Sequence, residues 1–191
     1  KTLLGGAGMV GGNYSPAIAG GKGGEVLLTT SRSVNFTGEN GIEGRRSGNY
    51  GASFGQSFTV GSTKVYNQDA TAAFGVGGVA HVVFANSAGV HYVFSLKTPY
   101  TTWSAPVKLN GGNAAQYYAN PSLTVSACGS DANVLHVVWA EFPSASDNYN
   151  VYYARKLART GYAWSPGLRV SSAATPTSSS SGLGIAANAN S

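Results

Sequence analysis

Charged side chains are scarce in this chain, and that scarcity argues against several classes of protein. Of the 191 residues, only 10% are Asp, Glu, Lys or Arg, whereas soluble domains average about 25%. The net charge of +5 reflects 7 acidic residues against 12 basic ones, and no long basic run occurs. Because a nucleic-acid-binding surface needs Lys and Arg gathered on one face, we expect no nucleic-acid partner.

Cysteine and long apolar runs are also nearly absent. Cys128 is the only cysteine, so no disulfide can form within the chain. We interpret it as a small buried hydrophobic residue, because no catalytic partner surrounds it in the sequence. The chain has no run of 18 apolar residues, which predicts no membrane span. No metal-binding spacing or calcium loop occurs either, so we expect no metal and no cofactor.

Glycine, tyrosine and short β-rich runs are what the chain contains instead. It has 27 Gly and 11 Tyr, and helical periodicity is nearly absent. Runs such as EVLLTTS, GVAHVVFA and NVLHVVWAE are rich in β-branched and aromatic residues, with Gly, Asn, Ser or Pro at their ends. Many short strands separated by turns predict an all-β fold. A composition rich in Gly and Tyr and poor in charge is typical of an extracellular protein or a protein of a cell or particle surface.

Two of these runs are near copies of one another. VAHVVFANS at residues 79–87 matches VLHVVWAEF at residues 134–142, and the match aligns His81 with His136. The repeated histidine could suggest a metal pair. We interpret both histidines as structural residues of a strand, because their neighbours are valines and not metal ligands.

The repeat extends beyond this pair of strands. Residues 90–97 align with residues 150–157, and the segments that follow align through a shared Trp-Ser pair. A third, more diverged copy lies upstream, where EVLLTTS aligns with LHVVWAE. In that copy Val26 takes the position of the two histidines. The chain therefore contains three related units.

Each unit has the length and the number of strands of one propeller blade. It contains four strand-like segments within about 50–55 residues, as a blade of a β-propeller does. We predict a partial β-propeller with three four-stranded blades, at residues 13–64, 65–116 and 117–176. Residues 1–12 resemble the end of a preceding blade, and residues 177–191 resemble the start of a further one. Since a blade buries its faces only against its neighbours, we expect either a piece of a longer chain or several copies that complete a ring.

Two segments resemble the sialidase-like propeller repeats known as BNR or Asp-box repeats. They are VHYVFSLKTPYTTWSAPVKLN at residues 90–110 and NVYYARKLARTGYAWSPGLRVSS at residues 150–172. Both keep the Trp-Ser pair and the strand after it, but Lys97 stands near the position of the family's turn aspartate. The resemblance implies the propeller fold and carries no activity, because the arginine and acidic residues of a sialidase site have no match here.

The propeller topology predicts where a ligand would bind. The first strand of each blade lines the central channel, and the loop that enters it opens on the same face as the loop between the second and third strands. Aromatic rings beside amide and carboxylate groups suit sugars, which stack through C–H faces and need paired hydrogen bonds. The residues predicted to contact a ligand on this face are Arg32, Asp69, Asn86, Tyr117, Tyr118, Asn120, Glu141 and Asp147.

The sequence leaves three functions open. We favour a non-catalytic propeller segment that serves as an extracellular or surface binding or assembly module, with glycan as its ligand. A second reading is a fragment of a sialidase-like glycoside hydrolase whose catalytic residues lie mostly outside this chain. Two-carboxylate hydrolysis needs a pair of acids about 5–10 Å apart, and no catalytic residue can be assigned from the sequence. The third reading is a purely structural propeller that assembles with other copies, or with other segments of the same propeller.

Overall fold

The chain folds almost entirely into β-strands. The computed structural model describes residues 13–34, 39–63, 67–86, 88–97, 100, 102–109, 117–128, 132–142, 149–158, 161–171 and 183–187. These residues form thirteen strands and two one-turn 3-10 helices, which confirms the all-β prediction. Within this described part, no helix is long and apolar enough to cross a membrane.

The strands form three antiparallel sheets, each of which follows the order of the chain. Blade 1 contains β1 (Asn13–Gly20), β2 (Val26–Val34), β3 (Glu39–Ser47) and β4 (Phe58–Thr63). Blade 2 contains β5 (Asn67–Phe74), β6 (Ala80–Asn86), β7 (Gly89–Lys97), β8 (Thr102–Trp103) and β9 (Val107–Lys108), the last two both pairing with β7. Blade 3 contains β10 (Tyr117–Cys128), β11 (Ala132–Phe142), β12 (Asn150–Leu157) and β13 (Leu168–Arg169).

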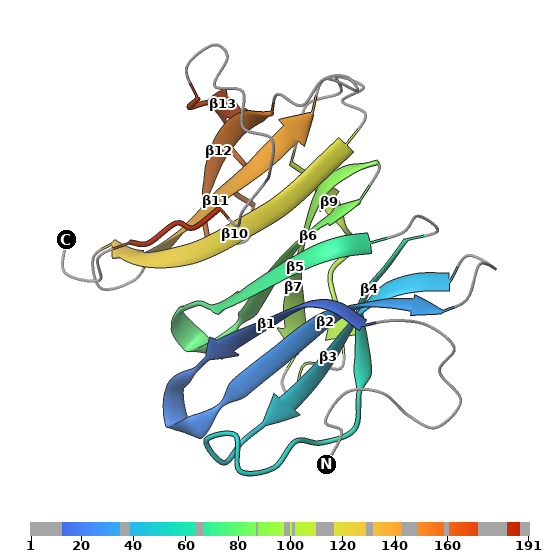
Figure 1. Cartoon of the computed structure of the whole chain (residues 1–191). Helices are drawn as coiled ribbons and strands as arrows, with labels where there is room; N and C mark the ends of the chain where they lie inside the picture. Colours follow the sequence, from blue (N-terminus) through green and yellow to red (C-terminus); the bar gives the residue numbers. More distant parts are fainter. Residues whose placement is uncertain are drawn as a thin grey trace.

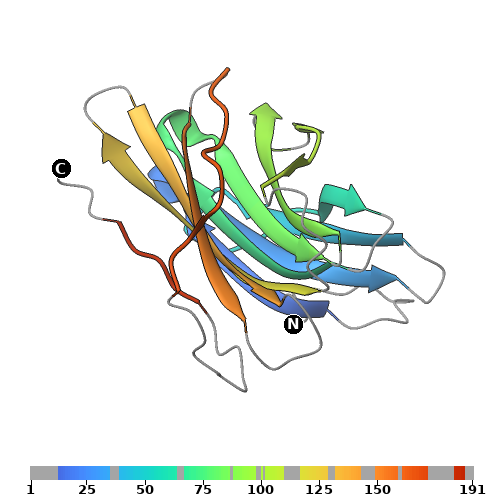
Figure 2. The same ribbon diagram turned by 90° about the horizontal axis from the view of Figure 1, so that it is seen from above.

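The three sheets fan out around their first strands. β1 contacts β5, and β5 contacts β10, so the first strands lie side by side (Figure 1). Seen from above, the later strands of each sheet spread away from this row (Figure 2). This arrangement of sheets face against face is that of successive propeller blades, and it confirms the predicted partial β-propeller. Residues 1–12 lie outside the described residues, and residues 183–187 run beside β10, where the Ile185 amide donates to Ser122 Oγ at 3.3 Å.

Glycines close the first hairpin of blades 1 and 2 in the same way. The one-turn helices η1 (Lys22–Gly24) and η2 (Val76–Gly78) join the first and second strands. Their central residues, Gly23 and Gly77, have φ values of 67° and 79°, a conformation that favours glycine. The glycine-rich segments at Lys22–Gly24 and Val76–Gly78 are therefore equivalent turns.

The strand registers shift the repeat alignment by one residue in the third strand. Val83 pairs with Tyr92 between β6 and β7, and Val138 pairs with Tyr153 between β11 and β12. Tyr92 therefore corresponds to Tyr153. The gapless alignment of residues 90–97 with residues 150–157 matches it with Tyr152, and that match is wrong by one residue. A one-residue shift matters, because it moves each side chain to the other face of its sheet.

The same shift affects the diverged copy in blade 1. Leu27 pairs with Arg46 as His136 pairs with Arg155. Leu27, and not Val26 as the sequence alignment placed it, stands at the histidine position of blade 1. The Leu27 side chain faces the following blade.

The core consists of two layers, one at each junction between blades. β6 is buried along its whole length, because its residues face alternate neighbours. Val82 and Phe84 join the layer between blades 1 and 2, and Val83 joins the layer between blades 2 and 3. The first layer is completed mainly by Leu27, Ile42, Val60 and Val93, and the second by Tyr92, Leu123, Leu135, Val137, Trp139 and Ala154.

Candidate functional site

The start of each first strand lies beside the end of the second strand in all three blades. Asn67 pairs with Asn86 in blade 2, and Tyr118 pairs with Glu141 in blade 3. In blade 1 the backbone of Arg32 occupies the same position beside the start of β1. The predicted site residues that the structure describes are therefore at one end of the sheets, although the side chains of Asp69, Asn86 and Glu141 make different contacts there.

Asp69 and Asn120 connect two blades. Asp69 Oδ2 accepts a hydrogen bond of 3.0 Å from the Asn120 backbone amide. Asn120 has a φ of 50° and lies in a stretch where the register between β10 and β11 shifts. Since a shift of this kind leaves backbone groups without ladder partners, the Asp69 carboxylate provides one of them. We assign this pair a structural role at the junction of blades 2 and 3.

Asn86 shapes a turn. Its side chain is 1% exposed, and its Oδ1 accepts a hydrogen bond of 2.8 Å from the Ala88 amide. This contact is the usual way in which Asn side chains organise a tight connection between strands. The backbones of Tyr117 and Tyr118 pair with the end of β11, and Asp147 lies outside the described residues.

Glu141 differs from the other predicted residues because it lines a cavity. It is only 9% exposed, and Trp139 Nε1 donates to its Oε1 at 2.8 Å. Burial raises the pKa of the Glu141 carboxyl, while the Trp139 hydrogen bond and the charge of Lys108 partly offset that rise. Trp139 and Glu141 are two residues apart in one strand, so both side chains face blade 2.

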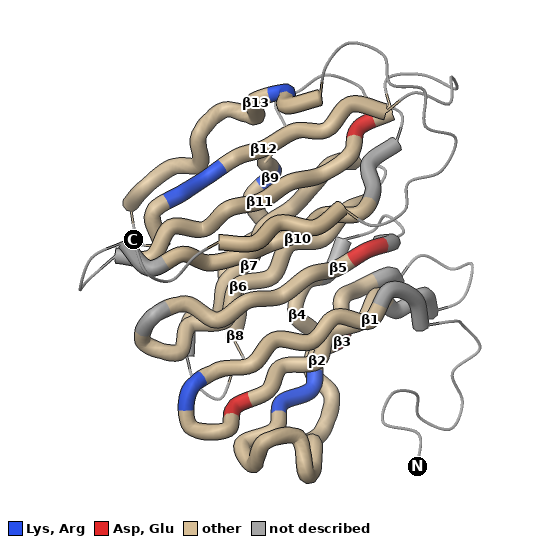
Figure 3. The backbone as a smooth tube through the Cα atoms, turned by 60° about the vertical axis from the view of Figure 1, so that its left-hand side comes forward, with Lys and Arg blue, Asp and Glu red and all other residues tan. Residues whose placement is uncertain are grey.

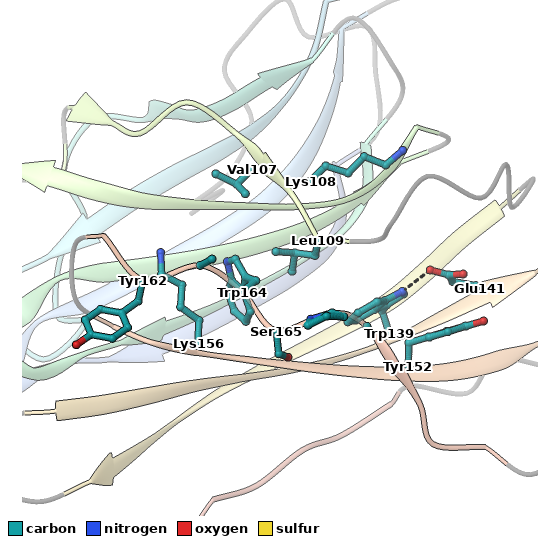
Figure 4. Close-up of a pocket in the computed structure, with 13 residues that line it drawn as sticks. Val107, Lys108, Leu109, Trp139, Glu141, Tyr152, Lys156, Tyr162, Trp164 and Ser165 are labelled. Atoms are coloured by element: carbon teal, nitrogen blue, oxygen red, sulfur yellow. Dashed lines mark hydrogen bonds between the residues drawn. The ribbon is translucent and has the colours of Figure 1, made fainter.

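The cavity lies between the outer strand of blade 2 and the surface of blade 3. Its volume is about 600 Å³, and Figure 4 shows the side chains around it. Blade 2 contributes one short segment from β9 and the residue after it, while blade 3 contributes β11, β12 and the connection that leads to β13. The lining residues are Val107, Lys108, Leu109, Trp139, Glu141, Tyr152, Lys156, Tyr162, Ala163, Trp164, Ser165, Pro166 and Gly167.

Aromatic rings form much of the cavity wall. Trp139 and Tyr152 are stacked, with centroids 5.8 Å apart and an angle of 17° between the rings. Trp139 is fully buried and supports Tyr152, which is partly exposed. Tyr162 is 50% exposed, and Trp164 packs edge-on against Tyr92 of blade 2 at 5.1 Å. The cavity therefore presents both ring faces and polar groups.

Two lysines border the cavity. Lys156 Nζ lies 5.3 Å from the ring centroid of Tyr92 and 5.8 Å from that of Phe94. Burial lowers the pKa of the Lys156 ammonium. Lys108 is exposed on β9 and lies near enough to Glu141 to influence its charge. Elsewhere the Lys and Arg residues of the described chain occur at separate places on the three blades (Figure 3).

The repeated histidines are bonded to tyrosines. His81 Nδ1 lies 2.8 Å from the Tyr92 hydroxyl, and His136 Nδ1 lies 2.8 Å from the Tyr153 hydroxyl. Burial, together with the charge of Lys156, lowers the pKa of His81 to about 4. Among the described residues, no group of three or more His, Cys, Asp or Glu side chains could hold a metal ion. The geometry supports the interpretation of both histidines as structural residues.

Most of the cavity was not predicted from the sequence. Of the predicted residues whose side chains the structure describes, only Glu141 lines it. Lys156, Tyr152 and Trp164 were aligned as repeat positions and given no role. One signal was available: the alternation Trp139-Ala-Glu141 places an aromatic and a carboxylate on one face of a strand. The partner surface on β9 comes from another blade, so local sequence could not reveal it.

No protein-family model matches the chain, and no curated protein is similar to it in sequence. Solved structures are similar in fold. The intramolecular trans-sialidase from Ruminococcus gnavus has a TM-score of 0.55 and 13% identity, and the match covers 85% of this chain and 33% of that one. A mutant of the GH43 protein BlXynB from Bacillus licheniformis has a TM-score of 0.55 and 14% identity, over 88% of this chain and 31% of that one.

The fold is part of a β-propeller, and its architecture is similar to that of these sialidase and GH43 structures. An exo-1,5-alpha-L-arabinanase from a bovine ruminal metagenomic library is also similar, with a TM-score of 0.50 and 14% identity over 86% of this chain and 61% of that one. These structural neighbours are glycoside hydrolases with propeller folds. The chain spans about a third of the length of the first two, and identities this low establish shared architecture alone.

Proposed function

We propose that this chain is a non-catalytic, carbohydrate-binding propeller segment that works outside the cell or on the surface of a cell or particle. The sugar site would be the cavity between blades 2 and 3. The observation that carries the proposal is the combination of aromatic rings with a buried, hydrogen-bonded carboxylate in one cavity of about 600 Å³. The carbohydrate-directed chemistry of the structural neighbours agrees with it.

The cavity fits the general features of a sugar site. Small-molecule pockets have volumes of about 300–1,000 Å³ and combine apolar walls with a few placed polar groups. Tyr152 and Tyr162 offer ring surface to the C–H face of a sugar. Among the described residues only Trp139 is hydrogen-bonded to the Glu141 carboxylate, at Oε1, so Oε2 can accept from a sugar hydroxyl.

The charged groups favour binding over hydrolysis. Glu141 is the one carboxylate among the described residues that line the cavity. Glycoside hydrolysis by the usual mechanism uses two carboxyl groups about 5–10 Å apart, one to protonate the leaving group and one to attack or activate water. Glu141 alone can orient a hydroxyl, and this supports a binding role.

We also propose that the blades are degenerate Asp-box repeats. The Trp-Ser pair has the same structural role in two blades: Ser104 Oγ accepts from the Phe94 amide at 3.1 Å, and Ser165 Oγ accepts from the Arg155 amide at 3.0 Å. In each case the serine fixes the return of the chain onto the third strand. Assembly with other copies, or with other propeller segments, remains part of the proposal.

The test is a binding measurement on a panel of plant, microbial and animal oligosaccharides, with calorimetry on those that bind. Glu141→Gln should weaken binding about tenfold or more, because a hydrogen bond to a charged group contributes about 1.5–3 kcal/mol. Tyr162→Ala should weaken it by a smaller factor. The matched control is Tyr50→Ala on blade 1, where Tyr50 is 83% exposed and distant from the cavity lining.

The same protein decides between binding and hydrolysis. Incubation with each bound oligosaccharide should release no reducing sugar. Release that disappears in Glu141→Gln while binding persists would overturn the non-catalytic proposal in favour of a glycoside hydrolase. Labelling of intact producing cells with a membrane-impermeant reagent tests the surface location, since an internal protein would stay unlabelled.

A further inference from the structure

Two hydrogen-bond donors at the cavity have no acceptor in the described part of the chain. Trp164 Nε1 is buried without a hydrogen-bond partner. Lys156 Nζ lies over aromatic rings, and no carboxylate or other acceptor is bonded to it there. A buried donor left unpaired costs about 1–3 kcal/mol, so the Trp164 indole calls for an explanation. The Lys156 ammonium is only half-buried.

The other junction between blades also places a cation over an aromatic ring, and there the cation belongs to the preceding blade and has a carboxylate partner. Between blades 1 and 2, Glu25 accepts hydrogen bonds from Arg46 and from the Tyr100 hydroxyl. Arg46 also lies over the Tyr100 ring, at 5.3 Å from its centroid. A cation, an aromatic ring and a carboxylate therefore form a complete set at that junction.

At the second junction the carboxylate is missing from the set. The turns at Gly21 and Gly75 are equivalent, since their amides donate to Glu25 O and Val79 O, each at 2.8 Å. Val79 therefore stands where Glu25 stands in blade 1. Phe94 stands where Arg46 stands, and the cation comes instead from blade 3, where Lys156 lies over Tyr92 and Phe94 and borders an open cavity.

We infer that the end of the cavity formed by Lys156, Tyr162 and Trp164 binds the anionic substituent of a saccharide, a carboxylate or a sulfate. The cavity would then select acidic sugars over neutral ones. This inference deepens the proposed function and rests on it, because it names the class of sugar that the same site takes. The anion would replace, from outside, the carboxylate that Glu25 supplies inside the protein at the first junction.

The two ends of the cavity give the ligand a direction. Glu141 lies at one end, and Lys156 lies at the other end beside Tyr162 and Trp164 (Figure 4). An anionic group at the Glu141 end would meet a carboxylate beside the Lys108 ammonium, whereas at the Lys156 end it meets an ammonium group with no carboxylate among the described lining residues. Hydroxyls of the same sugar, or of its neighbour, then fall near the Glu141 carboxylate. The lowered pKa of Lys156 agrees with an ammonium group that has lost hydration without gaining an anion.

The test compares three oligosaccharides of equal length: a neutral one, one that contains uronic acid, and one that carries sulfate. Calorimetry on the intact protein should show the acidic ligands binding at least tenfold more tightly than the neutral one. Lys156→Met, which keeps a long side chain over Tyr92 and Phe94, should remove that preference by weakening the binding of the acidic ligands about tenfold more than that of the neutral one. The matched control is Lys22→Met, an exposed lysine on blade 1.

Each outcome separates the two proposals. Equal binding of neutral and acidic ligands, or an equal loss for both in Lys156→Met, would overturn the selectivity and leave the sugar site in place. Failure of all three ligands to bind would overturn both. Preference for the sulfated or for the uronate ligand alone identifies the source of the anion. As an independent readout, the NMR signal of the Lys156 side chain should shift with the acidic ligand and stay unchanged with the neutral one.

Discussion

The two junctions between blades have the same arrangement of strands and differ in the side chains that lie between them. Between blades 1 and 2, Arg46 is paired with Glu25 and lies over Tyr100. Between blades 2 and 3, Lys156 lies over Tyr92 without a carboxylate among the described residues, and a cavity remains. The first junction satisfies its charges with residues of the chain, and the second leaves charge and space for something else.

One residue accounts for part of this difference. Tyr100 precedes Trp103 by three residues, and its carbonyl accepts from Trp103 Nε1 at 2.9 Å. The residue three positions before Trp164 is Gly161, which has no side chain to fill the junction, and Trp164 Nε1 has no partner. A large ring at the first junction is thus replaced by nothing at the second. A repeat protein can therefore form a cavity where one repeat has glycine in place of a large side chain.

The largest expected effect is a loss of stability on removing the large aromatic side chain at the centre of each junction. Phe84 and Trp139 are both fully buried and face the preceding blade. Replacing either with Ala should lower the free energy of unfolding by about 3–5 kcal/mol, because it removes a large core side chain and leaves a hole. Urea unfolding measures both changes, and a loss below about 1 kcal/mol in either variant would contradict the assigned core. Trp139→Phe, which keeps most of the packing but loses the bond to Glu141, should cost much less.

Acid should weaken the second junction in particular. His81 there corresponds to Leu27 at the first junction, and its pKa is lowered to about 4 by burial and by the charge of Lys156, with the Tyr92 hydroxyl as its hydrogen-bond partner. Between pH of about 6.5 and 4 the unfolded chain binds a proton that the folded chain excludes. The free energy of unfolding should therefore fall as the pH drops through this range, by about 3 kcal/mol in all.

The measurement for this prediction is stability against pH, with and without His81→Leu. The variant should flatten the profile between these pH values, since leucine binds no proton. Hydrogen exchange at pH of about 5 should show β7 and β12 opening before β2 and β3. An unchanged slope in His81→Leu would assign the acid sensitivity to another group.

A smaller effect is expected at the ion pair of the first junction. Burial alone would raise the pKa of Glu25, but hydrogen bonds from Tyr100 and Arg46 outweigh it and hold the pKa below its ordinary value. Glu25→Gln should lower the free energy of unfolding by about 1–2 kcal/mol, because the pair is partly exposed and partly screened. Part of this loss should disappear at 1 M salt. If the loss of stability in Glu25→Gln does not depend on salt, it comes from the packing of the side chain and not from its charge.

The smallest expected effect comes from installing the missing carboxylate at the second junction. Val79→Glu places an acid at the position equivalent to Glu25. We expect stability to rise by at most about 1 kcal/mol, since a partly exposed pair contributes little. The preference for acidic saccharides should fall at the same time, because the new carboxylate competes for the ammonium group. Stronger binding of acidic ligands in this variant would contradict the comparison of the two junctions.

The fold was predictable because its signals are local and repeated. Strand composition, glycine turns and the Trp-Ser pair recur along the chain, and each is visible within about ten residues. The register was less accessible: Tyr92 was aligned with Tyr152 when its structural counterpart is Tyr153. A shift of one residue changes no composition, yet it reverses which face a side chain occupies.

The candidate site was predictable only in part. Glu141 was expected to meet a ligand because it ends a strand, and the structure places it in a cavity. Asp69 was expected because it lies at the entrance of a strand and Asn86 because it ends one. In the structure Asp69 accepts from the Asn120 amide of the next blade, and Asn86 accepts from the Ala88 amide of a turn. Polar residues at strand ends serve as ligands or as caps, and the choice depends on which backbone groups happen to be unpaired nearby.

The sequence by itself determined that this chain is all-β and that its blades are related copies. It also determined that sheet must pack on sheet, because strands with apolar residues on both faces need a covering layer on each side. Only the tertiary structure decided that Lys156 of one blade lies over Tyr92 and Phe94 of another and that β9 completes a cavity with Glu141. These contacts join residues from different repeats. Their formation depends on how two sheets meet, and no local pattern encodes that distance.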